Sequence, residues 1–391
     1  MDRPRTSPSD KVTGLDAIRG AAAFIVFTGH FFRNFAPGLE RSANGTPFYT
    51  LFNGSAAVIV FFVLSGFVLS RRPLRSGRVL DIADAAIKRW PRLAGPVLLA
   101  GFAYIFGAVS GAFPRPAQVI AGSEPYLPFL LRGYGRHAEN IGGVLQEASF
   151  WAFLGSAPKF NEVLWTMHWE LIGSFVTFAM ALVICLRLPL LLLAVVAAAA
   201  AAHHPYLSCF PLGMIFCLLH ERYGRDASMA NWLAIGLVSL GLVLFSYNLL
   251  DPAGLWGWAA TLPAGTQLWA WVIIQNVAAM CFMSVALYHP GLRALLSGRL
   301  GAFLGGMSFP FYLLHVFVLC SFTSWMCILA GAKVPPLWLA LVLYAPTALV
   351  VCLVAYPLMR FDGWWVGMLN AAVPAARRAL AALYRRPAAA R

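Results

Sequence analysis

Charged residues are scarce in this sequence, and acidic ones are the scarcest. Only 11% of the 391 residues are Asp, Glu, Lys or Arg, and just 15 are acidic against 29 basic. A soluble domain carries roughly 25% charged residues, so a soluble fold of this composition could not cover its surface. Because 60% of the residues are hydrophobic and gather in continuous rather than alternating runs, the sequence predicts an all-α polytopic membrane protein.

Several signatures of metal proteins and nucleotide-binding enzymes are absent as well. The seven cysteines fall in apolar segments and form no C-x-x-C pair, which indicates small buried side chains rather than disulfides or metal ligands. There is no H-E-x-x-H motif, no Walker A loop and no dinucleotide-binding glycine fingerprint. His203-His204 is only a weak metal signal, so we expect no metal.

Ten apolar segments are candidates for membrane spans, each of which takes about 20 residues of helix. They are Leu15–Phe35, Leu51–Ser70, Leu93–Phe113, Leu164–Leu186, Leu188–Ala202, Pro205–Leu219, Trp232–Leu250, Leu268–Tyr288, Phe303–Leu329 and Leu337–Leu358. The fifth and sixth segments are short and interrupted by prolines, so they could be tilted, partly re-entrant or one broken element.

The basic residues cluster in the connections between these segments. The net charge of +14 would also suit nucleic acid, but this placement follows the positive-inside rule and indicates a lipid bilayer instead. With the N terminus inside, the inner segments hold 21 Lys and Arg and the outer segments seven. We therefore expect both termini in the cytoplasm, with a cytoplasmic segment (1–14), a transmembrane domain (15–359) and a basic cytoplasmic tail (360–391).

Two ionisable residues share one face of the first span. Arg19 and His30 are eleven residues apart, which is three helical turns plus about 20° and roughly 16 Å along the axis. A guanidinium near the cytosol suits a phosphate, and an imidazole deeper in suits general base work. A slender substrate such as coenzyme A, with its pantetheine arm, could reach both, although a polar contact between helices is the plainer alternative.

Further ionisable residues extend this pattern. Arg89 and Arg92 precede the third span at the depth of Arg19, where they would form an anion site or act as stop-transfer charges. Glu170 and His315 are expected at the depth of His30, where a carboxylate would orient the imidazole. Ser65 lies among small residues of the second span, a pattern that favours helix packing over catalysis.

Five short motifs then follow one another along most of the chain. They are Leu15-Asp16-Ala17-Ile18-Arg19-Gly20 with His30, Phe61-Phe62-Val63-Leu64-Ser65-Gly66-Phe67, Arg89-Trp90-Pro91-Arg92, Leu164-Trp165-Thr166 with Glu170, and Ser308-Phe309-Pro310-Phe311-Tyr312-Leu313-Leu314-His315. Together and in this order they resemble the signatures of the acyltransferase 3 family of integral membrane acyltransferases.

The resemblance implies an enzyme of ten spans in the inner cell membrane. Such an enzyme takes an acyl group, often acetyl, from cytosolic acyl-CoA and passes it to a hydroxyl of a carbohydrate, glycolipid or glycosylated metabolite. By the resemblance His30 is the essential histidine, and Arg19, Arg89 and Arg92 bind or position the donor. Beside it we predict Glu170 and His315 as further catalytic residues, and Ser65, Tyr312 and His168 as substrate contacts.

The sequence departs from the family pattern at two places. His168-Trp169 precedes Glu170 where other residues are usual, and Arg360-Phe361-Asp362 stands where many members have a Glu-Arg-Pro element. We therefore assign no function to the second place.

Two routes of transfer and two other functions stay open. His30 could act as a general base on the acceptor hydroxyl or carry the acyl group itself. A proton-coupled transporter would use His30 and Glu170 as a relay, but the sequence shows no internal repeat of the kind that transporters have. A non-catalytic scaffold leaves the ionisable residues in the spans unexplained.

Overall fold

The computed structural model describes residues 13–114, 136–155, 157–224, 227–331 and 337–384, and this part of the chain is all-α. The first half contains α1 (Thr13–Phe35), α2 (Pro37–Ala43), η2 (Pro47–Leu51), α3 (Gly54–Ser76), α4 (Val79–Val109), η3 (Arg136–Glu139), α7 (Ile141–Gln146), η4 (Glu147–Trp151), α8 (Ala152–Leu154), η5 (Glu162–Leu164) and α9 (Trp165–Cys185). The second half contains α10 (Leu191–His203), η6 (Pro205–Ser208), α11 (Cys209–Leu219), η7 (His220–Gly224), α12 (Asn231–Phe245), η8 (Gly254–Thr261), α13 (Ala264–Tyr288), α14 (Pro290–Leu296), α15 (Arg299–Val318), η9 (Leu319–Thr323), α16 (Ser324–Leu329) and α17 (Leu337–Tyr384).

Seven helical segments of the described chain are long and apolar enough to cross a membrane, where the sequence predicted ten. They are Gly14–Phe35, Gly54–Ser76, Val79–Val109, Glu162–Cys185, Ala264–Tyr288, Arg299–Leu329 and Leu337–Ala379. The other three predicted spans correspond to α10 and α12, which have 13 and 15 residues, and to α11, which η6 and η7 extend into one helical segment over residues 205–224. At 1.5 Å per residue α10 and α12 are about 20–22 Å long, short of the roughly 30 Å hydrocarbon core. The segment over residues 205–224 is about 30 Å long, but it ends in His220, Glu221 and Arg222 and is not among the segments apolar enough to span. The polytopic all-α class is confirmed, whereas ten full spans are not.

Glycines let the central helices approach closely. A Cβ at Gly20 of α1 would lie 2.6 Å from the Cβ of Leu304 in α15, and a Cβ at Gly66 of α3 would lie 2.2 Å from the carbonyl oxygen of Phe210 in α11. Side chains at either position would push the helices apart, because small residues are what allow tight packing between membrane helices. A Cβ at Gly54 of α3 would likewise lie 3.3 Å from the Cα of Val26 in α1, so α1 packs against both α3 and α15 at the centre of the bundle.

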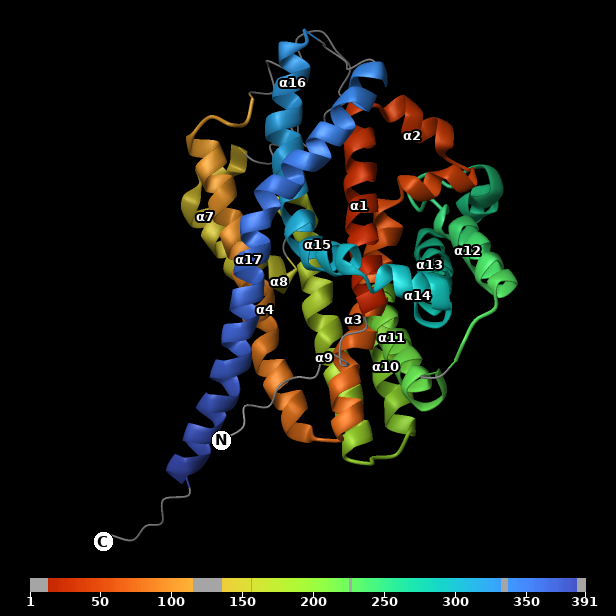
Figure 1. The fold of residues 1–391 in the computed structure, drawn as a ribbon, viewed down its shortest axis with the longest axis vertical. Coiled ribbons are helices and arrows are strands. Elements are labelled where there is room, and N and C mark those ends of the chain that lie inside the picture. Colours follow the sequence, from red (N-terminus) through yellow and green to blue (C-terminus); the bar gives the residue numbers. More distant parts are fainter. Residues whose placement is uncertain (1–12, 115–135, 156, 225–226, 332–336, 385–391) are drawn as a thin grey trace.

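The bundle has two flanks around this centre (Figure 1). The long helix α17 runs beside α4 on one flank, and α12, α13 and α14 form the other. The end of the bundle that holds the connection between α3 and α4 (residues 76–78) is here called the basic end. Ion pairs tie the helices together there, including Arg71 to Glu221 at 2.8 Å and Arg72 to Asp81 at 2.7 Å.

Helix α17 is continuous for 48 residues, about 72 Å at 1.5 Å per residue. The predicted start of the basic tail at residue 360 falls inside this helix. Side chains beyond that point pack against α4: the indole N–H of Trp365 donates to the carbonyl oxygen of Pro91 at 2.8 Å, and Arg377 pairs with Asp84. The expected orientation of the bundle, with both termini in the cytoplasm, stays a prediction.

Candidate active site

The arginines predicted to bind an anion lie together at the basic end. Arg19 of α1 and Arg89 and Arg92 of α4 line one cleft of about 390 Å³. The rest of its lining comes from α3, α4 and α17, with residues Ser65, Val68, Leu69, Ala85, Lys88, Val366, Leu369 and Asn370. Four cationic side chains from two helices therefore face one cavity, and α17 forms one of its walls.

Each arginine of the cleft has a carboxylate partner. Arg19 Nη1 lies 3.6 Å from Asp16 Oδ1, and Arg89 Nη2 donates to Glu170 Oε1. Arg92 donates through both Nη1 and Nη2 to the two carboxylate oxygens of Asp362, the second at 3.1 Å.

The lysine of the cleft differs, because Lys88 Nζ donates to the neutral amide oxygen of Asn370 at 2.8 Å. Four cations against the three carboxylates bonded to them leave the cleft at +1. Cations in a partly buried cavity need carboxylate partners of this kind. An anion that enters the cleft would take the place of these carboxylates.

Glu170 bonds two residues that line this cleft, Arg89 and Ser65. Its Oε1 also accepts a hydrogen bond from Ser65 Oγ at 2.5 Å, and Arg89 Nε donates to Ser174 Oγ at 2.6 Å. The side chains of Arg89 and Glu170 are 11% and 13% exposed. Two charges so little exposed hold each other in place, so Glu170 and Ser174 orient the Arg89 guanidinium.

Glu170 and His315 do not share the depth that the sequence suggested. Thr166, which starts the turn before Glu170, lies 3.0 Å from the Tyr312 hydroxyl, and Tyr312 is one turn before His315 on α15. Glu170 bonds Arg89 and Ser65, whereas His315 bonds His30. The reason is that the chain is already inside the bundle at Asn161, whose buried amide donates to the carbonyl oxygen of Leu313.

The structure brings His30 and His315 together. His30 Nδ1 lies 2.8 Å from His315 Nε2, and the rings stack with centroids 5.1 Å apart. His315 is fully buried, and its Nδ1 lies 2.8 Å from the backbone carbonyl oxygen of Tyr312.

The tautomers of this pair follow from its hydrogen bonds. A carbonyl oxygen can only accept, so His315 carries its proton on Nδ1 and accepts on Nε2. In the neutral pair His30 then donates from Nδ1, and its lone pair is on Nε2. This assignment gives His30 the basic nitrogen that proton transfer needs.

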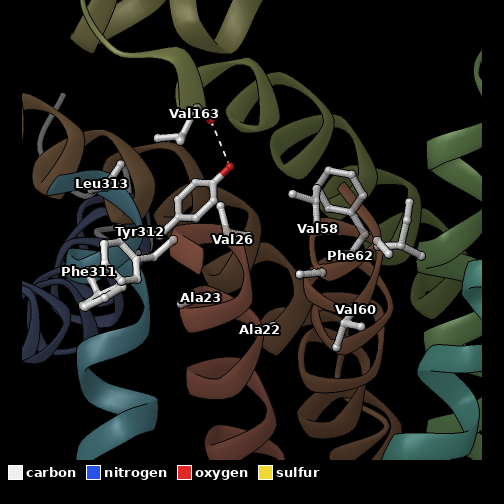
Figure 2. Packing of buried hydrophobic residues seen from close by; sticks show 14 of the residues in the cluster. Ala22, Ala23, Val26, Val58, Val60, Phe62, Val163, Phe311, Tyr312 and Leu313 are labelled. Carbon is white, nitrogen blue, oxygen red and sulfur yellow. Dashed lines mark hydrogen bonds between the residues drawn. The ribbon is translucent and has the colours of Figure 1, made fainter. Parts of the chain in front are cut away.

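Small buried side chains lie between the cleft and the histidine pair. Ala23 and Val26 of α1 follow the face that runs from Arg19 to His30, and both are buried. Figure 2 shows Ala23 and Val26 beside Phe311 and Tyr312 of α15, with the Tyr312 hydroxyl donating to the carbonyl oxygen of Val163 at 3.1 Å. His30 is not among the residues that line the cleft.

The predicted substrate contacts are spread over three places. Ser65 lies in the cationic cleft and Tyr312 between the cleft and the histidine pair. His168 lies elsewhere: its Nδ1 is 3.0 Å from the carbonyl oxygen of Phe153, and its ring packs edge-on against Trp169, which stacks on His204.

Sequence reasoning missed Lys88, which lines the cleft, and Ser174 and Asp362, which bond its arginines. Ser174 gives no local signal, because a serine in an apolar helix usually bonds its own backbone. Asp362 stands where the sequence departs from the family pattern, and Lys88 adjoins a predicted motif. In the part of the chain that the structure describes, no three His, Cys, Asp or Glu side chains gather in a way that could hold a metal ion.

One comparison with known proteins gave a match. A family model described as an acyltransferase domain matches residues 12–357, nearly the whole chain. No curated protein and no solved structure matched significantly.

Proposed function

The chain belongs to the acyltransferase 3 family of membrane acyltransferases, and on this premise we propose that it is an acyl-CoA-dependent O-acyltransferase. The acyl group, acetyl in the simplest case, would come from cytosolic acyl-CoA and go to a hydroxyl of a carbohydrate, glycolipid or glycosylated metabolite. The proposed location is the inner cell membrane, with the basic end in the cytosol.

The observation that carries this proposal is the cationic cleft. Lys88, Arg19, Arg89 and Arg92 face a cavity of about 390 Å³ at the basic end. Guanidinium groups match phosphate oxygens in pairs, and an ammonium adds a compact charge. The pyrophosphate and ribose phosphate of coenzyme A would exchange with the carboxylates that now occupy these cations.

The histidine pair supplies the proton chemistry. The acceptor oxygen attacks the thioester carbonyl, so that a carbon–oxygen bond forms and the carbon–sulfur bond breaks. His30 Nε2 takes the hydroxyl proton during attack and returns it to the coenzyme A thiolate. His315 holds the Nδ1 proton of His30 and thereby fixes the tautomer, the role that a third group plays for an activated base.

A second route uses the same nitrogen as a nucleophile. His30 Nε2 would attack the thioester, so that a carbon–nitrogen bond forms and the carbon–sulfur bond breaks with release of the thiolate. The acceptor oxygen would then take the acyl group from Nε2, and its hydroxyl proton would go to the thiolate. In either route the pantetheine arm must reach about 16 Å along α1 from Arg19 to His30. Along this path the arm would displace or wedge between the small side chains of Ala23 and Val26.

Transfer of label from acyl-CoA tests the proposal. Membranes with the full chain are incubated with radiolabelled acetyl-CoA, and label is followed into glycans, glycolipids and glycosylated metabolites. We expect transfer that disappears in His30→Ala and persists in His137→Ala, the control at an exposed histidine of η3. Equal thermal unfolding of the two variants shows that both fold.

Labelling that His30→Ala leaves unchanged would refute the role of His30. A chain that transfers no acyl group but moves protons together with a small molecule across vesicles would be the transporter of the alternative hypothesis.

A further inference from the structure

A second cavity lies at the basic end, apart from the cationic cleft. It measures about 880 Å³ and lies between the ends of α3 and α11, lined by Leu74, Arg75, Leu218, Leu219, Glu221, Arg222 and Tyr223. On α3 the cleft uses Val68 and Leu69, whereas this groove uses Leu74 and Arg75. Six residues of helix turn the side chains by about 240° and advance them about 9 Å, so the two cavities open on different sides of α3.

The groove is built on a fixed π-helical turn. Glu221, Arg222 and Tyr223 all come from η7. The turn is tethered behind by His220, whose Nδ1 lies 3.2 Å from the Tyr288 hydroxyl, and by Gly224, where a Cβ would lie 2.6 Å from the same oxygen. Such turns are often found at functional sites, and this one holds its side chains against the end of α3.

The charge of the groove is positive. Glu221 accepts from Arg71 Nε at 2.8 Å and from Arg75 Nε at 2.9 Å, and Arg222 lies 5.4 Å above the Tyr223 ring centroid. The lining of the groove holds two arginines, Arg75 and Arg222, against one glutamate and so carries a charge of +1. An anion placed here would meet Arg75 and Arg222 from two different helical segments.

The rest of the lining is apolar and open to the surroundings of the bundle. Leu219 is 50% exposed and Tyr223 is 70% exposed. Exposed leucines beside exposed aromatic and basic side chains at the end of a membrane helix mark the boundary between acyl chains and headgroups. Basic pockets between helices at the cytoplasmic surface recognise anionic lipid headgroups.

We propose that this groove binds an anionic phospholipid of the adjoining leaflet. Arg75 and Arg222 contact the phosphate of the headgroup, and Leu74, Leu218 and Leu219 contact the first part of the acyl chains. A soluble phosphate would use the cations but gain nothing from the leucines, which is why the lipid is the occupant that the lining favours. The proposal does not depend on acyl transfer.

Native mass spectrometry of the full chain tests it with three probes, which are phosphatidylglycerol, phosphatidylcholine and inorganic phosphate. We expect phosphatidylglycerol to be retained at least about fivefold over phosphatidylcholine, because each arginine near the surface contributes about that factor. In Arg222→Gln the retention of phosphatidylglycerol should fall about fivefold. Arg293→Gln, at an exposed arginine of α14, is the matched control and should lose none.

Leu219→Gln separates the lipid from a soluble anion. We expect it to weaken retention of phosphatidylglycerol, and because Leu219 is half exposed it should leave thermal unfolding unchanged. Equal retention of both lipids, or equal losses in Arg222→Gln and Arg293→Gln, would overturn the proposal. The proposal would also be overturned if millimolar phosphate fully displaced phosphatidylglycerol and Leu219→Gln did not change its retention. That result would indicate a site for soluble phosphate.

Discussion

Asp362→Asn should strengthen binding of the acyl donor. Asp362 accepts hydrogen bonds from both terminal nitrogens of Arg92, which lines the cationic cleft, so a phosphate that binds these nitrogens has to displace it. The substitution removes the competing charge and raises the charge of the cleft from +1 to +2, while the amide oxygen of Asn can still accept one hydrogen bond from Arg92.

The size of the effect follows from the exposure of the pair. A hydrogen bond to a charged group contributes about 1.5–3 kcal/mol, but the Arg92 side chain is 31% exposed and Asp362 14%. Screening by solvent reduces the figure to about 1–1.4 kcal/mol, which corresponds to a KM for acetyl-CoA roughly fivefold to tenfold lower. Because the effect is electrostatic, it should shrink as ionic strength rises.

The chain offers a matched control in a second ion pair between the same two helices. Arg377 of α17 donates to both carboxylate oxygens of Asp84 on α4, at 2.8 and 3.1 Å, and neither residue lines the cleft. Asp84→Asn should loosen the packing of α17 on α4 to a similar degree. Because Asp84 bonds Arg377 and acts on the cleft only through its charge near Lys88, its effect on KM should be much smaller than that of Asp362→Asn.

The assay is initial-rate acyl transfer with membranes of each variant over a range of acetyl-CoA concentrations. A higher KM in Asp362→Asn would show that Asp362 holds Arg92 in its binding position rather than competing for it. An equal fall in KM in both variants would assign the effect to the position of α17, and either result refutes the reasoning.

Three further predictions concern the cleft and the histidine pair. Lys88→Gln should raise the KM for acetyl-CoA about fivefold, since a cation that meets a phosphate at the membrane surface contributes about 1 kcal/mol; an unchanged KM would place the phosphates elsewhere. Glu170→Gln should lower thermal stability and leave the pH profile of kcat unchanged, because Glu170 bonds Arg89 rather than His30. A shifted pH profile would show that Glu170 takes part in proton transfer. His315→Ala should lower kcat about 10- to 100-fold through loss of one strong hydrogen bond. His315→Gln should recover part of the lost kcat, because its amide oxygen can still accept from His30 Nδ1. Equal losses of kcat in both variants would argue against a positioning role for His315.

The residue types in this sequence determined its class. A chain with so few charges and such long apolar runs can satisfy its backbone in lipid only as helices, and the all-α polytopic class followed directly. The family also followed from the sequence, because its five motifs are local strings that need no structure to be seen. The spacing of Arg19 and His30 on one helix face is likewise set by the helix period alone.

Contacts between helices were beyond the reach of the sequence. Hydropathy counted α10 and α12 as spans, because it measures apolar content and does not show where a helix begins and ends. It also placed Glu170 with His30, because the depth of α9 depends on how the preceding segment enters the bundle. Only tertiary structure decides which helices are neighbours, and that choice pairs His30 with His315, Glu170 with Arg89 and Arg92 with Asp362 across long stretches of chain.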